Sequence, residues 1–277
     1  MIRGTTELIA HIGFPTHTFK SPMIYNPYFE QTGVDAVVVP MGCEGPAYPA
    51  FLRAVFTLTN IRGALITMPH KLVTVGLLDE ASAAVKIAGS CNAVRRNADG
   101  RLVGDLFDGE GFVRGVRRKG RDPVGSRALV VGCGGVGSAI AASLAGAGAA
   151  AISLYDTRAE SAAALADRLR AHYPRLEVRT GVNDPAGHDL VVNATPMGMN
   201  EGDPMPVDVA RIAPATFVGE VVMKRETTAF LAAARARGCA VQVGTDMLFE
   251  QIPAYLEFFG LPSTSPEMLR SLARLSD

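Results

Sequence analysis

Residues 132–137 have the types and spacing that bind the phosphates of a dinucleotide. They read GCGGVG, follow the apolar run 128–131 and precede an alanine-rich segment. In a GxGxxG turn the first glycine permits the tight bend, the second lets a pyrophosphate approach the backbone, and the third lets helix and strand pack closely. The N–H groups at the start of the helix then face the phosphates. The residues expected to contact the cofactor here are Gly132, Gly134, Gly135, Val136 and Gly137.

An acidic residue after the next expected strand bears on the choice of cofactor. Asp156 ends the run 151–156, within the spacing of about 20 residues or slightly more that such folds use. A carboxylate there accepts hydrogen bonds from the ribose hydroxyls of NAD and repels the 2′-phosphate of NADP. Thr157 offers no cation to hold that phosphate, whereas Arg158 could do so. We therefore favour NAD, with NADP possible. Asp156 could alternatively cap the following helix.

The elements around this turn predict an α/β fold. From residue 126 onward, short apolar runs alternate with helical patterns, which is typical of a parallel sheet with helices on both faces, as in a doubly wound Rossmann-type domain. Before it, 34–40 and 61–69 are expected to be strands, and 46–58 and 71–88 helical. The runs 91–96 and 102–107, joined by an Asn-Ala-Asp-Gly turn, predict a hairpin.

Composition narrows the class of protein. The chain has 277 residues, 27 basic and 27 acidic, and its formal net charge is zero. Nucleic-acid binders and polybasic membrane-surface proteins carry a basic surplus, so neither is expected. Its four cysteines are scattered without a CxxC, and no His/Cys cluster suggests a metal site. The N-terminus lacks the pattern of a secretory signal. We expect a cytoplasmic protein, monomeric or homodimeric, that binds small molecules.

Five blocks of the chain, in order, resemble the shikimate dehydrogenase family. They are ITMPHK (66–71), GSCNAV (89–94), GDLFDG (104–109), NATPMGM (193–199) and GTDMLFEQ (244–251). The resemblance covers nearly the whole chain. It implies a substrate-binding domain over 1–104, completed by 246–277, and an NAD(P)-binding Rossmann domain over 105–245. It also implies hydride transfer between a nicotinamide cofactor and a ring hydroxyl or ketone of shikimate, 3-dehydroshikimate or a related cyclic substrate, a step of aromatic amino acid biosynthesis.

The resemblance also assigns roles to single residues. Lys71 and Asp108 stand at the family's two catalytic positions. Removing a hydride from a secondary alcohol requires that the hydroxyl proton leave, so a proton acceptor must lie within hydrogen-bond reach of the oxygen. The residues at substrate-binding positions are Phe19, Ser21, Thr67, Asn92 and Gln251. Those at further cofactor positions are Asn193, Ala194, Thr195, Met199, Val221 and Gly244.

Several positions depart from the family's pattern. Phe19 stands where the family has the first of two serines that bind the substrate carboxylate, and Leu65, Leu106 and Met223 also replace polar residues. Each unpaired polar group of a shikimate-like ring would cost about 1–3 kcal/mol. The substrate is therefore shikimate bound weakly, or a different ring such as quinate or an aminoshikimate-type compound. A non-catalytic nucleotide-binding regulator is a further alternative, which the retention of Lys71 and Asp108 disfavours.

Two histidines of the first hundred residues are expected to be structural. His11 lies in an apolar run and is predicted to be a near-core residue with its hydrogen bonds satisfied. His70, between Pro69 and Lys71, is predicted to make a hydrogen bond in a turn.

Overall fold

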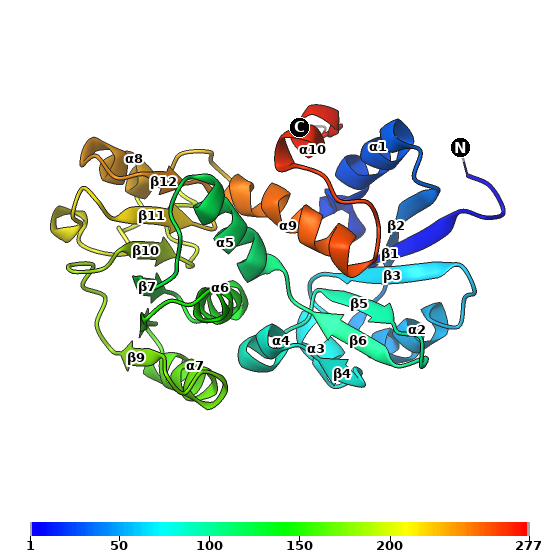
Figure 1. The fold of residues 1–277 in the computed structure, drawn as a ribbon, viewed down its shortest axis with the longest axis horizontal. Helices are drawn as coiled ribbons and strands as arrows, with labels where there is room; N and C mark the ends of the chain where they lie inside the picture. The colour runs from blue at the N-terminus through cyan, green and yellow to red at the C-terminus, as the bar shows by residue number, and fades with distance from the viewer. Residues whose placement is uncertain (1, 276–277) are drawn as a thin grey trace. The chain divides into compact units, whose positions relative to one another are not determined.

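The computed structural model describes residues 2–275 (Figure 1). Contacts divide the chain into two compact units. The first contains the residues up to Val85, Gly89–Phe107, and the residues from Ile252 onward. The second contains Lys86–Ala88 and Asp108–Gln251. Within the described residues, no helix combines the length and the apolar composition needed to cross a membrane.

The first unit is built on a mixed sheet with the strand order β2-β1-β3-β5-β6-β4. Strand β1 pairs in parallel with β2 and with β3, while β5 runs antiparallel to both β3 and β6, so the predicted hairpin is confirmed. Its strands are β1 (Glu7–Gly13), β2 (Ala36–Gly42), β3 (Ile61–Ile66), β4 (Glu80–Ala81), β5 (Ala93–Arg96) and β6 (Leu102–Asp105). Its helices include α1 (Pro22–Thr32), α2 (Tyr48–Val55), α3 (Lys71–Val75) and α10 (Pro266–Leu272).

The segment 71–88 is not the single helix that its pattern predicts. Helix α3 ends at Val75, strand β4 follows, and α4 (Ala83–Ala88) begins after Ser82, whose hydroxyl accepts a hydrogen bond from the Val85 N–H at 3.2 Å. Two tertiary contacts explain the break: β4 pairs with β6, and the Asp79 carboxylate accepts from the Leu102 N–H at 2.7 Å. Strand pairing with a distant segment thus overrides the local helical periodicity.

The second unit is built on a fully parallel sheet with the order β12-β11-β10-β7-β8-β9. This order reverses between β7 and β10, as in doubly wound dinucleotide-binding folds, so the predicted fold class is confirmed. Its strands are β7 (Arg127–Val131), β8 (Ala151–Tyr155), β9 (Glu177–Thr180), β10 (Leu190–Asn193), β11 (Phe217–Glu220) and β12 (Val241–Gln242). Its helices include α5 (Asp108–Arg118), α6 (Gly135–Gly146), α7 (Ala159–His172) and α8 (Ala229–Ala236), and α9 (Gly244–Phe258) begins in it.

Both faces of this sheet are apolar and covered. Ala128 and Val130 belong to a cluster that includes residues of α5, α6 and α7, whereas Leu129 and Val131 belong to one that includes residues of α8. Because successive side chains of a strand point to opposite faces, β7 packs helices on both sides of the sheet.

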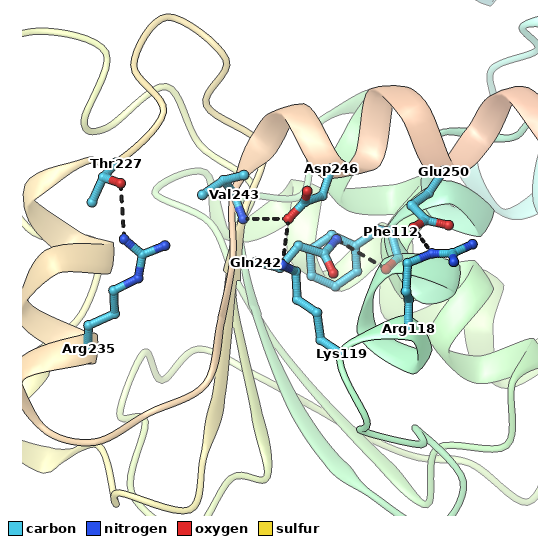
Figure 2. A network of polar contacts seen from close by, with 9 residues as sticks. All are labelled: Phe112, Arg118, Lys119, Thr227, Arg235, Gln242, Val243, Asp246 and Glu250. Atoms are coloured by element: carbon cyan, nitrogen blue, oxygen red, sulfur yellow. Dashed lines mark hydrogen bonds and ion pairs between the residues drawn. The ribbon is translucent and has the colours of Figure 1, made fainter. Parts of the chain in front are cut away.

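Polar contacts hold α5, β12 and the first turns of α9 together (Figure 2). The Gln242 side-chain amide donates to the carbonyl of Phe112 at 3.2 Å, and Lys119 pairs with Asp246 at 3.1 Å. Arg118 forms an ion pair with the buried carboxylate of Glu250. These contacts fix the last residues of the second unit against the helix that begins at Asp108.

A buried carboxyl group joins the ends of β10 and β11 to α8. Glu220 is fully buried and lies beside Asn193 in the strand register. Its Oε2 accepts a hydrogen bond from the hydroxyl of Thr228, the N-cap of α8, at 2.8 Å. Burial raises the pKa of Glu220 to about 7, although hydrogen bonds from Thr228 and Asn193 work against that rise. The protonated form of Glu220 therefore persists in the folded protein well above pH 4.5.

The stability of the fold should consequently depend on the protonation of Glu220. The pKa of Glu220 is higher in the folded protein than in the unfolded chain. Protonated Glu220 therefore contributes its full share of the unfolding free energy below about pH 4.5, and this share is lost as the pH rises through 7. Relative to Glu220→Gln, the wild type should lose roughly 2–4 kcal/mol of unfolding free energy between pH 4.5 and pH 8. Denaturant unfolding at several pH values measures this. Glu177→Gln, on the exposed edge strand β9, is the control; equal pH dependence of wild type and Glu220→Gln would contradict the assignment.

Candidate active site

The glycine turn of the second unit leaves no room for a side chain at its first and third glycines. Gly132 follows β7 with φ of +98°, and a Cβ at this residue would lie 2.8 Å from the carbonyl oxygen of Ala194. A Cβ at Gly137 would overlap the carbonyl oxygen of Gly132. Gly134 is the N-cap of α6, so the free N–H groups of this helix follow directly on the turn. The first and third glycines of GxGxxG are therefore required by packing, as their spacing predicts.

A cavity of about 580 Å³ lies beside this turn. Its lining comes from the ends of β7, β8 and β10 and from the loop after β10, which is where doubly wound sheets bind nucleotides. Of the predicted cofactor residues it includes Gly132, Gly134, Asp156, Arg158, Ala194 and Thr195. The other lining residues are Val131, Tyr155, Thr157, Asn183, Pro196, Met197, Asn200, Asp203, Pro204, Met205 and Pro206.

Asp156 presents a fixed negative charge to this cavity. Its two oxygens accept hydrogen bonds from the N–H groups of Cys133 at 2.8 Å and Arg158 at 2.9 Å. Burial alone would raise the pKa of Asp156, but the Arg158 and Cys133 N–H groups outweigh it and hold the pKa below its ordinary value. The N-cap of α7 is Arg158, so Asp156 does not cap that helix. The Arg158 guanidinium is largely exposed, with Nε 3.9 Å from the Asp156 carboxylate.

The loop after β10 is shaped by its own side chains. Asn193, fully buried, donates from its amide to the carbonyl of Met197 at 2.9 Å and accepts from the hydroxyl of Thr195 at 2.6 Å. Further along, the Asp203 carboxylate accepts from the N–H groups of Gly198 and Asn200. The sequence does not predict that Asn200 and residues 203–206 form a wall of the cavity. The signal available was Asp203 within a glycine- and proline-rich stretch, the composition of a hydrogen-bonded turn.

The remaining predicted cofactor residues support the cavity without lining it. Gly135, Val136 and Gly137 form the first turn of α6. Val221 donates its N–H to the carbonyl of Asn193 at 3.2 Å, and a Cβ at Gly244, the first residue of α9, would overlap the carbonyl of Val222. Met199 is partly exposed and lies in the same loop as Asn193.

In the first unit, Thr67 and Lys71 follow the carboxyl end of β3, and Phe19 lies close to the carboxyl end of β1. Thr67 follows β3, and its N–H donates to the carbonyl of Ile12 on β1 at 3.0 Å. Lys71 is the first residue of α3, and its carbonyl accepts from the N–H of Cys91 at 2.9 Å. The prediction for His70 is confirmed, since its Nε2 lies 2.7 Å from the carbonyl oxygen of Cys43 and its ring stacks on Tyr48.

Asn92 connects this edge to the hairpin. It is buried, and its Oδ1 accepts from the N–H of Phe107 at 3.0 Å, whereas its Nδ2 has no hydrogen-bond partner. Ser21 is the N-cap of α1 and makes no side-chain capping hydrogen bond. An amide nitrogen left without a partner in a buried position is available to a ligand.

The positions that depart from the family's pattern differ in burial. Phe19, Leu65 and Leu106 are buried in the first unit, whereas Met223 in the second is about half exposed. The ring of Phe19 stacks on His11 with centroids 4.0 Å apart. Contrary to expectation, His11 is not satisfied: its Nδ1 is buried without a hydrogen-bond partner.

Asp108 and Gln251 belong to the second unit by contacts. Asp108 is the buried first residue of α5. Gln251, on α9, packs against Gly111 of α5, and its Oε1 is buried without a hydrogen-bond partner. The two predicted catalytic residues therefore come from different units, each at the start of a helix.

The chain is similar to known proteins over nearly its whole length. Residues 11–94 match the model of the shikimate dehydrogenase substrate binding domain. The chain is 35% identical to a shikimate dehydrogenase (NADP(+)) from Rubrobacter xylanophilus, over 98% of this chain and 97% of the relative.

Solved structures agree with that relationship. A shikimate 5-dehydrogenase from Listeria monocytogenes in complex with shikimate and NAD superposes with a TM-score of 0.91 at 25% identity, over 98% and 97% of the two chains. A ligand-free 5-ketofructose reductase from Gluconobacter sp. strain CHM43 superposes with a TM-score of 0.87 at 25% identity, over 96% and 98%.

These similarities favour an enzyme over a non-catalytic regulator and a nicotinamide dinucleotide over any other cofactor. The protein belongs to the shikimate dehydrogenase family and is an oxidoreductase of that type, acting on a CH–OH group.

Proposed function

We propose that the protein transfers a hydride between NAD and a ring hydroxyl or ketone of a shikimate-like substrate, with Lys71 and Asp108 handling the proton. Oxidation of the alcohol breaks one C–H and one O–H bond. Bound NAD would accept the hydride, and the hydroxyl proton would pass to the uncharged amine form of Lys71. Asp108 stands at the second catalytic position that the family resemblance assigns. The observation that carries this proposal is that one chain of this family has both Lys71 at the start of α3 and the glycine turn at Gly132.

NAD is the preferred cofactor on electrostatic grounds. The Asp156 carboxylate lines the cavity, is held by two backbone N–H groups and stays ionised. It can accept hydrogen bonds from a ribose but repels a 2′-phosphate. The Rubrobacter relative is named for NADP(+), and the Listeria structure holds NAD, so both cofactors occur among similar proteins. In this chain the charge at Asp156 favours NAD.

Unpaired polar atoms favour a substrate with several hydroxyl groups. In the first unit the Nδ2 of Asn92 is buried without a partner, and Thr67 and Ser21 offer hydroxyls. In the second unit the Oε1 of Gln251 is also buried without a partner. A site built to hydrogen-bond hydroxyls discriminates strongly against analogues that lack them, because its own groups would stay unpaired.

A second candidate substrate is an uncharged polyhydroxy ketone, as the name of the Gluconobacter 5-ketofructose reductase suggests. Phe19 favours it: a buried phenyl ring stands where the family resemblance places a carboxylate-binding serine. Quinate and aminoshikimate-type rings remain alternatives among the shikimate-like substrates.

Lys71→Ala should abolish turnover while leaving NAD binding intact. A positioned proton acceptor contributes about 10²–10⁴-fold to rate, so kcat should fall by at least 10²-fold. Absorbance of reduced nicotinamide with shikimate, quinate and 5-ketofructose measures turnover, and calorimetry measures NAD binding. The exposed Lys86→Ala serves as the matched control and should keep full activity. Loss of NAD affinity in Lys71→Ala would show that this lysine belongs to the cofactor site instead.

Asp156→Asn should shift the cofactor preference toward NADP. The amide oxygen can still accept from the Cys133 N–H, but the repulsion of the 2′-phosphate is gone. The ratio of kcat/KM for NAD over NADP should fall about tenfold or more, since a hydrogen bond to a charged group is worth about 1.5–3 kcal/mol. Asp167→Asn, on the exposed face of α7, is the control. A wild type that already prefers NADP would overturn the cofactor assignment.

A further inference from the structure

We propose that His11 binds a hydroxyl group of the substrate through Nδ1 and is a specificity-determining residue of this enzyme. The inference rests on the proposed function and deepens it. It states that the substrate group bound by His11 is an uncharged hydroxyl rather than a carboxylate.

The position of His11 on the sheet brings it to the substrate-binding edge. It lies on β1, in register with Leu65 of β3 and Pro40 of β2. Two residues further along, β1 ends at Gly13, and β3 ends at Ile66, just before Thr67 and Lys71. The parallel pairing therefore places His11 two residues before the strand end at which the residues predicted to contact the substrate begin.

Burial leaves one nitrogen of His11 without a partner. The residue is 6% exposed, and its Nδ1 neither donates nor accepts a hydrogen bond within the described structure. Buried polar atoms in folded proteins are usually satisfied, and one that is not calls for a water or a ligand. Asn92, the residue before β5, presents the same feature at Nδ2.

Phe19 restricts how a ligand can reach His11. The two rings stack with centroids 4.0 Å apart and planes inclined by 26°, so one face of the imidazole is covered. A Cβ at Gly13 would lie 3.0 Å from Cζ of Phe19 and would overlap the methyl group of Thr67. Phe19 and Thr67 thus both lie close to Gly13, at the end of β1. A ligand cannot stack on the face of the imidazole that Phe19 covers, so it must bind His11 by another route than stacking there.

Charge determines which ligand group fits. Burial, assisted by the positive charge of Lys71, lowers the pKa of His11 to about 4. The imidazole is thus neutral at physiological pH and offers one N–H and one lone pair. A hydroxyl can accept from the first or donate to the second. A carboxylate would instead require a cation or several donors. The cation near His11 is Lys71, which the proposed function uses for the proton, and the neighbouring side chains Phe19 and Leu65 add no donor.

Three substitutions of His11 test the proposal. Asn places its amide group near the position of Nδ1, Gln reaches toward that of Nε2, and Leu keeps the approximate volume without a polar atom. Steady-state kinetics are measured with shikimate, quinate and 5-ketofructose, on whichever the wild type turns over best. We expect His11→Leu to raise the KM of that substrate at least tenfold, with the KM of NAD and the melting temperature unchanged. His11→Asn should restore most of the loss and His11→Gln little of it.

The outcomes separate this inference from the proposed function. If the wild type turns over a substrate and His11→Leu has the same KM, the role of His11 is wrong and the proposed function stands. Equal KM values for His11→Asn and His11→Gln overturn the role of Nδ1, and this comparison decides the matter if His11→Leu does not fold. If the folded wild type binds NAD yet turns over none of the three compounds with either cofactor, the proposed function is wrong and the inference falls with it.

Discussion

The carbonyl oxygen of Gly132 fills the space that a side chain at Gly137 would need. This close approach lets α6 begin directly after the turn that follows β7, so its free N–H groups start beside the cavity that Gly132 and Gly134 line. The same turn packs against Ala194, the first residue after β10. One backbone contact thus sets the position of the helix, the turn and the loop that together line the cavity of the second unit.

Buried polar groups divide into those the fold satisfies and those it leaves open. Asn193 and Thr228 spend their hydrogen bonds on holding the loop after β10 and the end of β11. Asn92 and Gln251, in contrast, each keep a buried polar atom without a partner. An unpaired buried group costs about 1–3 kcal/mol, so a ligand that pairs it recovers stabilisation on binding.

How far the sequence predicts the structure depends on the range of the interactions involved. The strand, turn and helix at 128–146 follow from local pattern and glycine sterics, and the parallel sheet with helices on both faces follows from alternating elements. The break within 71–88 does not, because the pairing of β4 with β6 joins segments some twenty residues apart. The wall formed by Asn200 and Asp203 was missed for a similar reason, since a loop's place beside a cavity is set by tertiary contacts. His11 was mispredicted because an apolar run signals burial but not whether a buried nitrogen finds a partner.

The neutral overall charge leaves recognition to local groups, and their signs constrain the substrate. Asp156 adds a negative charge at the cofactor cavity, so attraction for the pyrophosphate comes from the N–H groups at the start of α6. In the first unit, Lys71 acts on His11 strongly enough to help keep it neutral, and Phe19 and Leu65 add no donors. A substrate carboxylate placed beside His11 would stabilise the charged ammonium form of Lys71, whereas accepting the hydroxyl proton requires the uncharged amine. A hydroxyl at that point is uncharged and has no such effect on Lys71. The apolar replacements and the neutral histidine therefore both favour a substrate that places a hydroxyl beside His11.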